Sequence, residues 1–192
     1  MGSAQLITRF GDNTAGLSKE TLEELNRVYR PLSFAERIRR VYEDFPPDRI
    51  MVTSSFAATS AYFLHIISTI RPEQPVHFID TGYHFADTLK YRDYLVEKFG
   101  LQVIDVTPDP DHHQVSLENR MWETDPDLCC QVNKVNPLEE AKEDYDLWIS
   151  SLMGWQTEHR AGLEVFEERR GMIKFNPMID VTKEQRDAYI KE

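Results

Sequence analysis

The chain has 192 residues, 41% hydrophobic and 29% charged, a size and composition that fit one globular domain and exclude a disordered chain. Its formal net charge of −11 opposes binding to a phosphate backbone, which excludes nucleic acid as an expected partner. Because no stretch approaches the ~20 apolar residues of a membrane span and no basic-then-apolar leader opens the sequence, we expect a cytoplasmic protein with no membrane partner.

Two amphipathic helices are predicted at the start of the chain. The first runs from Ser18 to Tyr29, with its apolar residues on one face. The second begins at Ser33 with a capping box and ends before a pair of prolines. We therefore expect residues 1–46 to form a helical segment packed on an α/β domain that comprises residues 47–192.

Short apolar runs alternate with helix patterns after residue 46. Four of these runs have the length of buried strands: Ile50–Thr53, Val76–Ile79, Gln102–Val106 and Leu147–Ser150. This alternation predicts a parallel sheet with helices on both faces, and ligands of such sheets bind beyond the carboxyl ends of the strands. One rim of loops is therefore expected, formed by Ser54–Ser60, Asp80–Gly82, Thr107–His113 and Ser151–Arg160.

A loop of small and polar residues follows the first predicted strand. It contains Ser54, Ser55, Phe56 and Ser60, and a helix pattern begins at its end. Small side chains let the backbone approach an anion, while hydroxyls and the first free N–H groups of the helix donate hydrogen bonds to it. The loop lacks the Gly-Lys-Ser/Thr ending of a Walker sequence, and a purely structural helix cap remains an alternative.

Two further rim segments carry groups that could contact an anionic ligand. Asp80-Thr81-Gly82 follows the second strand, where Gly82 permits a close turn and Asp80 can accept hydrogen bonds from a ligand. An ordinary turn is the alternative for these three residues. After the fourth strand, Arg160 offers a bidentate fork for phosphate or sulfate, and its place on the expected rim favours that role over a solvated arginine.

The segment Asp109–His113 carries two aspartates and two histidines at the same rim. Four such side chains could hold a metal ion, but their spacing fixes no tetrahedral geometry. An exposed loop is therefore the preferred interpretation.

The chain has two cysteines, the adjacent Cys129 and Cys130, and Lys134 follows one helical turn after Cys130. Neighbouring cysteines bridge each other only with strain, so the pair is interpreted either as two ligands of a thiophilic metal centre or as buried structural thiols. The Lys134 ammonium would offset the negative charge of such a centre or of a substrate. A site of four thiolates needs two further cysteines, which this chain lacks.

Taken in order, these motifs resemble the adenylyl-sulfate/phosphoadenylyl-sulfate reductase family. The motifs that carry the resemblance are Ser54-Ser55-Phe56, Phe78-Ile79-Asp80-Thr81-Gly82, Cys129-Cys130 with Lys134, and Trp148-Ile149-Ser150 leading to Gln156 and Arg160. The likeness extends from about Phe34 to Glu192. It implies a fold of the adenine-nucleotide α-hydrolase type, also called the PP-loop type.

The family also implies an activity: the thiol-dependent reduction of adenylyl sulfate to sulfite and AMP in sulfate assimilation. Members with a Cys-Cys pair carry a [4Fe–4S] cluster and prefer adenylyl sulfate, whereas members without it take phosphoadenylyl sulfate. By resemblance, Ser54, Ser55, Phe56 and Ser60 would line the anion-binding loop, and Asp80, Thr81 and Gly82 would border the nucleotide. Lys134 and Arg160 would contact the phosphosulfate. Cys129 and Cys130 would be ligands of the cluster.

In this family a cysteine near the C-terminus attacks the sulfur, and thioredoxin or glutaredoxin then releases sulfite. That cysteine and the second cysteine pair are absent from the 192 residues, so we expect a C-terminally truncated reductase, inactive alone, that forms a homo-oligomer when complete. A basic stretch common in the family is replaced by Leu152-Met153-Gly154-Trp155. The alternatives are a phosphoadenylyl-sulfate reductase, an ATP-cleaving PP-loop adenylyltransferase and a non-catalytic nucleotide-binding scaffold.

Overall fold

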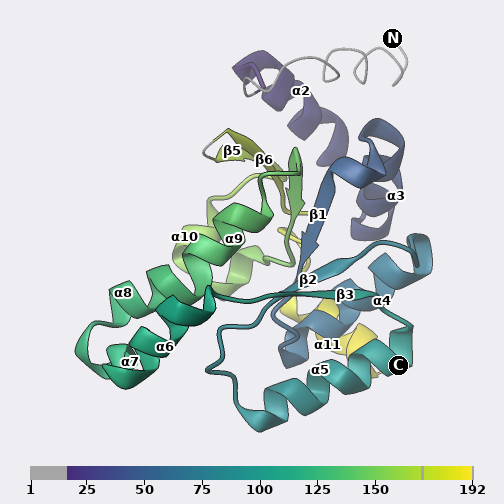
Figure 1. The fold of residues 1–192 in the computed structure, drawn as a ribbon. Helices are drawn as coiled ribbons and strands as arrows, with labels where there is room; N and C mark the ends of the chain where they lie inside the picture. The colour runs from purple at the N-terminus through teal and green to yellow at the C-terminus, as the bar shows by residue number, and fades with distance from the viewer. Residues whose placement is uncertain (1–16, 170, 192) are drawn as a thin grey trace.

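Six strands form one sheet in the order β3-β2-β1-β4-β6-β5 in the computed structural model, which describes residues 17–169 and 171–191 (Figure 1). All neighbouring strands are parallel except β5 and β6, which form an antiparallel hairpin. The predicted parallel α/β class is therefore confirmed. The strands are β1 (Ile50–Thr53), β2 (Val76–Ile79), β3 (Val103–Val106), β4 (Leu147–Ile149), β5 (Phe166–Arg169) and β6 (Met172–Phe175).

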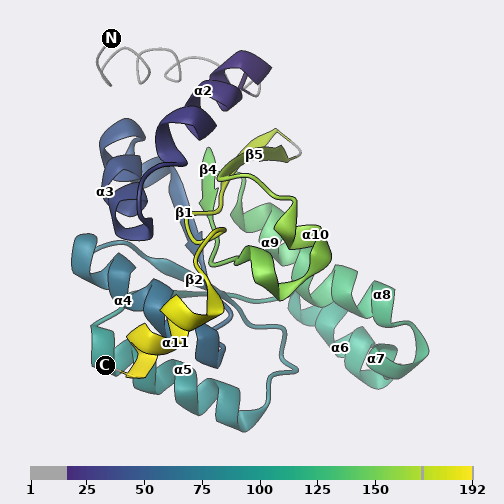
Figure 2. The ribbon, with the colours of Figure 1, turned by 180° about the vertical axis from the view of Figure 1, so that it is seen from behind.

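Helices cover both faces of this sheet (Figures 1 and 2). The α-helices are α2 (Lys19–Tyr29), α3 (Phe34–Asp44), α4 (Ala61–Ile70), α5 (Ala86–Phe99), α6 (Pro110–Glu118), α7 (Met121–Thr124), α8 (Pro126–Cys130), α9 (Asn136–Ala141), α10 (Glu158–Ala161) and α11 (Lys183–Lys191). A π-helical segment, η3 (Gln131–Val135), joins α8 to α9, and short 3₁₀ turns occur at η1 (Pro47–Arg49), η2 (Ala58–Ser60) and η4 (Gly154–Gln156). Among the described residues, no helix is both long and apolar enough to cross a bilayer.

Alternate residues of the strands point to one side of the sheet, which we call the apolar face. Aromatic rings from three elements meet there: the ring centroids of Tyr29 and Phe166 are 4.8 Å apart, and those of Phe166 and Phe175 are 4.5 Å apart. Helices α3 and α4 contribute further buried side chains to the same core. The strand residues of the apolar face are Ile50, Val52, Val76, Phe78, Leu147, Ile149, Phe166, Ile173 and Phe175.

The opposite side of the sheet, which we call the polar face, carries Met51, Thr53, His77, Trp148 and Lys174. Helix α9 and the segment after it lie over this face. The Trp148 indole N–H donates to Thr53 Oγ1 at 2.8 Å, and the Lys174 Nζ lies 4.9 Å from the Trp148 ring centroid. Buried charge and hydrogen bonding therefore concentrate on this side of the sheet.

The described part of the N-terminal segment is tied to the rim of the sheet by Arg37. Its guanidinium is fully buried. It donates to the carbonyl oxygens of Tyr29, Arg30 and Pro177 and pairs with both carboxylate oxygens of Asp180 at 2.6 and 2.7 Å. The two predicted helices thus pack on the α/β body, while residues 1–16 lie outside the described residues and the boundary after residue 46 stays a prediction.

Strand β5 lies at an edge of the sheet, and α2 covers part of that edge. The Asn26 side chain donates from Nδ2 to the Phe166 carbonyl at 2.9 Å and accepts from the Phe166 N–H at 2.8 Å. These are the two backbone groups that a further strand would use. A side-chain amide therefore occupies the place of a strand at this position.

One strand hairpin was missed, and one local expectation was wrong. The hairpin β5–β6 was not predicted, because β5 is rich in exposed charge and Lys174 interrupts the apolar pattern of β6. The segment Asp109–His113, expected as a loop, forms the start of α6. Asp109 accepts from the His112 N–H at 3.0 Å and Pro110 occupies the first turn, an arrangement that suits a helix N-terminus.

Candidate functional site

The carboxyl ends of the parallel strands form one rim, as expected for this architecture. Backbone hydrogen bonds extend the ladder into the loops, from the Ser54 N–H to the His77 carbonyl at 3.1 Å and from the Asp80 N–H to the Val106 carbonyl at 2.9 Å. Segments far apart in sequence therefore leave the sheet together. The buried Asn176, which follows β6, also reaches this rim and accepts from the Ser150 hydroxyl at 3.2 Å.

The loop Ser54–Ser60 after β1 is fixed by an internal hydrogen bond and by the buried side chain of Phe56. The Phe56 N–H donates to the Ser54 hydroxyl at 3.1 Å, and Phe56 adopts a left-handed conformation with φ of 49°. The Phe56 ring is fully buried and packs edge-on against Phe78 at 5.6 Å. The expected ligand contact of Phe56 therefore falls on its backbone, because its side chain belongs to the core. Ser55 is exposed, whereas Ser54 and Ser60 are buried.

The Asp80-Thr81-Gly82 turn is closed by its own side chains. Asp80 accepts from the Gly82 N–H at 3.0 Å, and Thr81 accepts from the Tyr83 N–H at 3.3 Å. Gly82 has φ of 74°, and a Cβ added there would lie 2.6 Å from two atoms of the His113 ring. Glycine is required here for two reasons, the left-handed backbone and the close approach of an imidazole.

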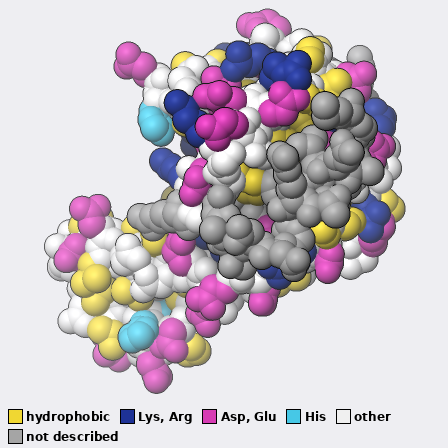
Figure 3. Space-filling view, turned by 90° about the horizontal axis from the view of Figure 1, so that it is seen from above, with side chains coloured by type: hydrophobic (Ala, Val, Ile, Leu, Met, Phe, Trp, Pro, Cys, Tyr) yellow, Lys and Arg dark blue, Asp and Glu magenta, His cyan; other side chains and the backbone are white. Residues whose placement is uncertain are grey.

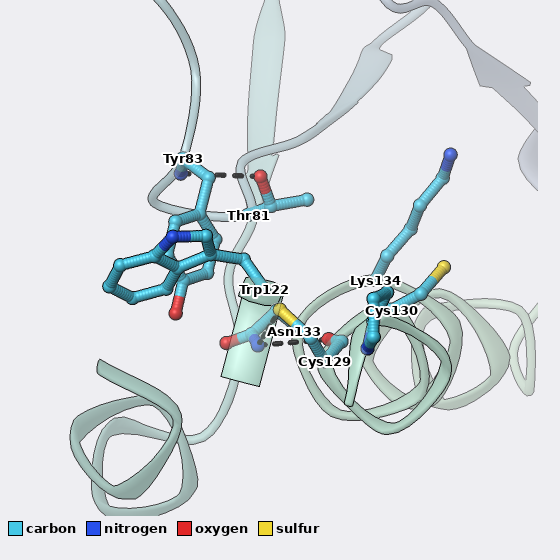
Figure 4. Close-up of a pocket in the computed structure, with 8 residues that line it drawn as sticks. Thr81, Tyr83, Trp122, Cys129, Cys130, Asn133 and Lys134 are labelled. Carbon is cyan, nitrogen blue, oxygen red and sulfur yellow. Dashed lines mark hydrogen bonds between the residues drawn. The ribbon is translucent and has the colours of Figure 1, made fainter. Parts of the chain in front are cut away.

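A cavity of about 430 Å³ lies between this turn and the helices α7, α8 and η3 (Figure 4). It brings Thr81 together with Cys129, Cys130 and Lys134, although the turn and the cysteine pair lie far apart in sequence. Lys134 and the Cys130 sulfur extend on one side of the helix, while the Cys129 sulfur turns toward Tyr83 and Trp122. The full lining is Thr81, Tyr83, Trp122, Pro126, Cys129, Cys130, Asn133 and Lys134.

Helices α6, α7 and α8 form a lobe that projects from the body of the molecule (Figure 3). No residue between 107 and 146, all of them described, belongs to the main cluster of buried hydrophobic side chains. The lobe instead exposes several large apolar residues, namely Val115, Leu117, Trp122 and Leu128. Its internal order must therefore come largely from polar contacts.

Those polar contacts converge on Cys129, which is buried. Its sulfur accepts from the Ser116 hydroxyl at 3.7 Å and from Asn133 Nδ2 at 3.6 Å. Asn133 also bonds to His113, and Ser116 to Tyr83. Both donors are themselves buried. Cys129 is thus a fixed thiol within a hydrogen-bonded network.

Cys130 and Lys134, by contrast, are exposed at the cavity. Two adjacent thiols match half of the donor set of a four-thiolate iron–sulfur centre. Among the described residues, no group of three or more histidine, cysteine or acidic side chains could hold a metal ion. The described residues therefore supply at most two thiol ligands of such a centre and do not complete it.

Arg160 lies in α10, and the cavity lining includes neither it nor Ser54 nor Asp80. Its guanidinium donates to the side-chain amide oxygen of Gln156, Oε1. The charge of Arg160 affects Lys174 on the polar face. Burial lowers the pKa of Lys174, and Arg160 is among the nearby cations that lower this pKa further. The structure thus joins Thr81, the cysteine pair and Lys134 in one cavity, and places Arg160 nearer to Lys174.

Tyr83, Ser116 and Asn133 were not predicted from the sequence. Each is a common polar residue without a motif of its own, and they meet because a turn, α6 and η3 pack together. No sequence signal identified them. The structure adds one, because Asn133 lies in the π-helical segment η3, and such segments are frequent at functional sites.

A mostly parallel sheet with helices on both faces and a polar loop after β1 is an α/β fold of the kind that binds ligands beyond the carboxyl ends of its strands. The solved structure of a phosphoadenylyl-sulfate reductase from Candida auris, a phosphate complex, has this fold, with a TM-score of 0.77 and 24% identity over 93% of this chain and 88% of that one. The phosphoadenosine phosphosulfate reductase domain family matches residues 49–192, and the chain belongs to this family.

Named relatives of the chain include reductases of both sulfonucleotides. It is 35% identical to phosphoadenosine 5′-phosphosulfate reductase of Thiocapsa roseopersicina, over 88% of this chain and 73% of that protein. It is 37% identical to adenosine 5′-phosphosulfate reductase of Chelativorans sp. (strain BNC1), over 74% of this chain and 59% of that protein. The chain therefore spans between about three fifths and three quarters of the length of these relatives.

Proposed function

We propose that the chain is the nucleotide-binding body of a reductase that converts adenylyl sulfate to sulfite and AMP at the expense of thiols. The cavity that joins Thr81 to Cys130 and Lys134 carries this proposal. The exposed Lys134 ammonium lines this cavity together with the cysteine pair and with Thr81 of the turn after β2, which supports a role in binding an anionic substrate. Membership of the reductase family and relatives named for both sulfonucleotides support the substrate class.

The proposed reaction is a thiol attack on the sulfur of the sulfonucleotide. A sulfur–sulfur bond forms, the bond from sulfur to the bridging oxygen breaks, and AMP leaves with the electron pair. A second thiol, from thioredoxin or glutaredoxin, then attacks the enzyme sulfur, and sulfite leaves as a disulfide forms. Lys134 and Arg160 would stabilise the charge on the leaving phosphate, and the loop Ser54–Ser60 would hold the nucleotide by its N–H and hydroxyl groups.

Cys129 and Cys130 would hold two positions of a [4Fe–4S] cluster, with two further thiolates supplied from outside the 192 residues. When bound, such a cluster would supply a charged metal–sulfur centre to the site. The attacking thiol of the family is likewise not one of this pair. We therefore expect the 192-residue chain to bind nucleotide and to release no sulfite.

The proposal is tested by measuring nucleotide affinity calorimetrically for the chain and for its Lys134→Gln variant. Removing a charge-assisted contact to the phosphosulfate should weaken adenylyl sulfate binding about tenfold or more. Lys19→Gln, which removes an exposed lysine from α2, is the matched control and should leave the affinity unchanged.

Two outcomes contradict the proposal: equal affinity in the parent and Lys134→Gln, or no binding of any adenine nucleotide. Competition between AMP and adenosine 3′,5′-bisphosphate separates the two substrates. Stronger competition by AMP favours adenylyl sulfate, and stronger competition by the bisphosphate favours phosphoadenylyl sulfate.

A further inference from the structure

The buried network around Cys129 connects three segments of the chain to one sulfur atom. Ser116 comes from α6, Asn133 from η3 and Tyr83 from the turn after β2. The Ser116 hydroxyl is central, since it lies 3.0 Å from the Tyr83 hydroxyl and accepts from Asn133 Nδ2 at 2.9 Å. Polar groups at this depth are costly unless they are paired. The network is therefore a built arrangement in which the loss of one member leaves the others unsatisfied.

Asn133 has the largest number of contacts in this network, and its orientation is fixed. It is 1% exposed, and Nδ2 donates to the Cys129 carbonyl at 2.9 Å as well as to Ser116 and to the Cys129 sulfur. Its Oδ1 lies 2.7 Å from His113 Nδ1, which must be the donor. Reversing the amide would place an oxygen against the Cys129 carbonyl, so only one orientation satisfies all partners.

His113 is fixed in turn by the Asp80-Thr81-Gly82 turn. Its ring rests against Gly82, where any Cβ would overlap with it, and it packs edge-on against Tyr83 at 5.4 Å. A direct sequence of contacts therefore runs from the nucleotide rim through His113 and Asn133 to Cys129. This gives His113, considered above as a metal ligand, a different use.

We infer that Asn133 is a positioning residue that fixes the sulfur of Cys129 and leaves Cys130 as the accessible thiol of the pair. The two cysteines are then not equivalent, although they are adjacent in sequence. One is held among buried donors, and the other is free at the cavity beside Lys134. Thiol accessibility in the folded chain is independent of nucleotide binding. Labelling can therefore contradict this inference while the proposed function stands, and the proposed function can fail while the two thiols still differ in accessibility.

The test is site-resolved labelling of the folded chain with iodoacetamide, followed by mass spectrometry of the peptide that contains both cysteines. In the parent, Cys130 should be labelled first and Cys129 slowly. Asn133→Asp keeps the size of the side chain and removes both Nδ2–H donors. Because the new carboxylate also disfavours the reactive thiolate, the rates are compared at alkaline pH, where they no longer rise with pH. We expect the variant to raise this limiting rate of Cys129 about tenfold, the factor that corresponds to roughly 1.4 kcal/mol, with the rate of Cys130 unchanged.

Asn136→Asp is the matched control, because it makes the same charge change at an exposed position on the same helical segment. It should alter neither rate. Ser116→Ala removes one donor to the sulfur and should raise the Cys129 rate by a smaller factor; it also keeps the test open if Asn133→Asp does not fold. Equal rates for the two cysteines in the parent would overturn the inference. So would a variant that accelerates both thiols alike, or an Asn133→Asp protein in which Cys129 remains as slow as in the parent.

Discussion

The two faces of the sheet are built from the same strands and serve different purposes. The apolar face packs aromatic and aliphatic side chains against α3 and α4. The polar face holds a histidine, a tryptophan and a buried lysine under α9. Successive residues of one strand, such as Ile173 and Lys174, therefore enter opposite environments. The difference shows that every second residue of a strand stabilises the fold, whereas the residues between them can carry polar and charged side chains.

The largest expected effect is on the apolar face. Phe175→Ala should lower the free energy of unfolding by about 3–5 kcal/mol, because it removes a fully buried ring that packs against Tyr29 and Phe166. Urea denaturation followed by circular dichroism measures this change. Phe85→Ala, at an exposed ring, is the control and should change stability little. A loss below about 1 kcal/mol for Phe175→Ala would contradict the conclusion that the apolar face stabilises the fold.

A smaller effect is expected for Lys174→Met on the polar face. Burial disfavours the charged ammonium and lowers the pKa of Lys174, with Arg169 adding to the effect and Glu167 opposing it. Methionine fills similar space without a charge, although the contact with Trp148 is lost. The variant should therefore stay within about 1 kcal/mol of the parent or exceed it in stability. A loss as large as that of Phe175→Ala would show that Lys174 secures the fold.

The smallest effect is a pH dependence from His77. Burial lowers the pKa of His77 below its ordinary value of 6.5. As the pH falls through 6.5, the unfolded chain therefore takes up a proton before the folded chain does, and stability decreases. Its ring partner Tyr145, whose pKa burial raises, stays neutral throughout.

Urea titrations at pH 7.5 and 5.5 should accordingly show lower stability at the lower pH, with a smaller difference in His77→Gln. Identical differences in the two proteins would assign the pH dependence to other groups.

The pattern of apolar residues was sufficient to predict the strands with mostly apolar sequences, and it was insufficient where a strand carries charged side chains. Runs such as Ile50–Thr53 and Val76–Ile79 predicted strands at the observed positions, because three of the four residues in each run are apolar. The hairpin β5–β6 escaped prediction, since Glu168 and Arg169 face solvent and Lys174 is an interior cation. Its burial depends on Trp148, a residue of another strand, and local patterns carry no such information.

The candidate site was predicted in part for the same reason. Helical spacing placed Lys134 beside Cys130, and the strand rule placed Thr81 at the rim; both line the observed cavity. The contacts of Asn133 with Ser116 depend on how α6 packs against η3, which a single sequence does not specify. The expectation that Arg160 joins the same pocket rested on its position after β4, and the structure places it beyond the lining of this cavity.

The amide of Asn26 has a consequence for how copies of this protein can associate. With both hydrogen-bonding groups of Phe166 already engaged, a neighbouring molecule cannot extend the sheet past β5 without first displacing that side chain. Continuous sheets across subunits, and the fibrous aggregates that begin in the same way, are thereby disfavoured at this border. An assembly of several copies is then expected to use other surfaces, such as the helices or the opposite edge strand β3.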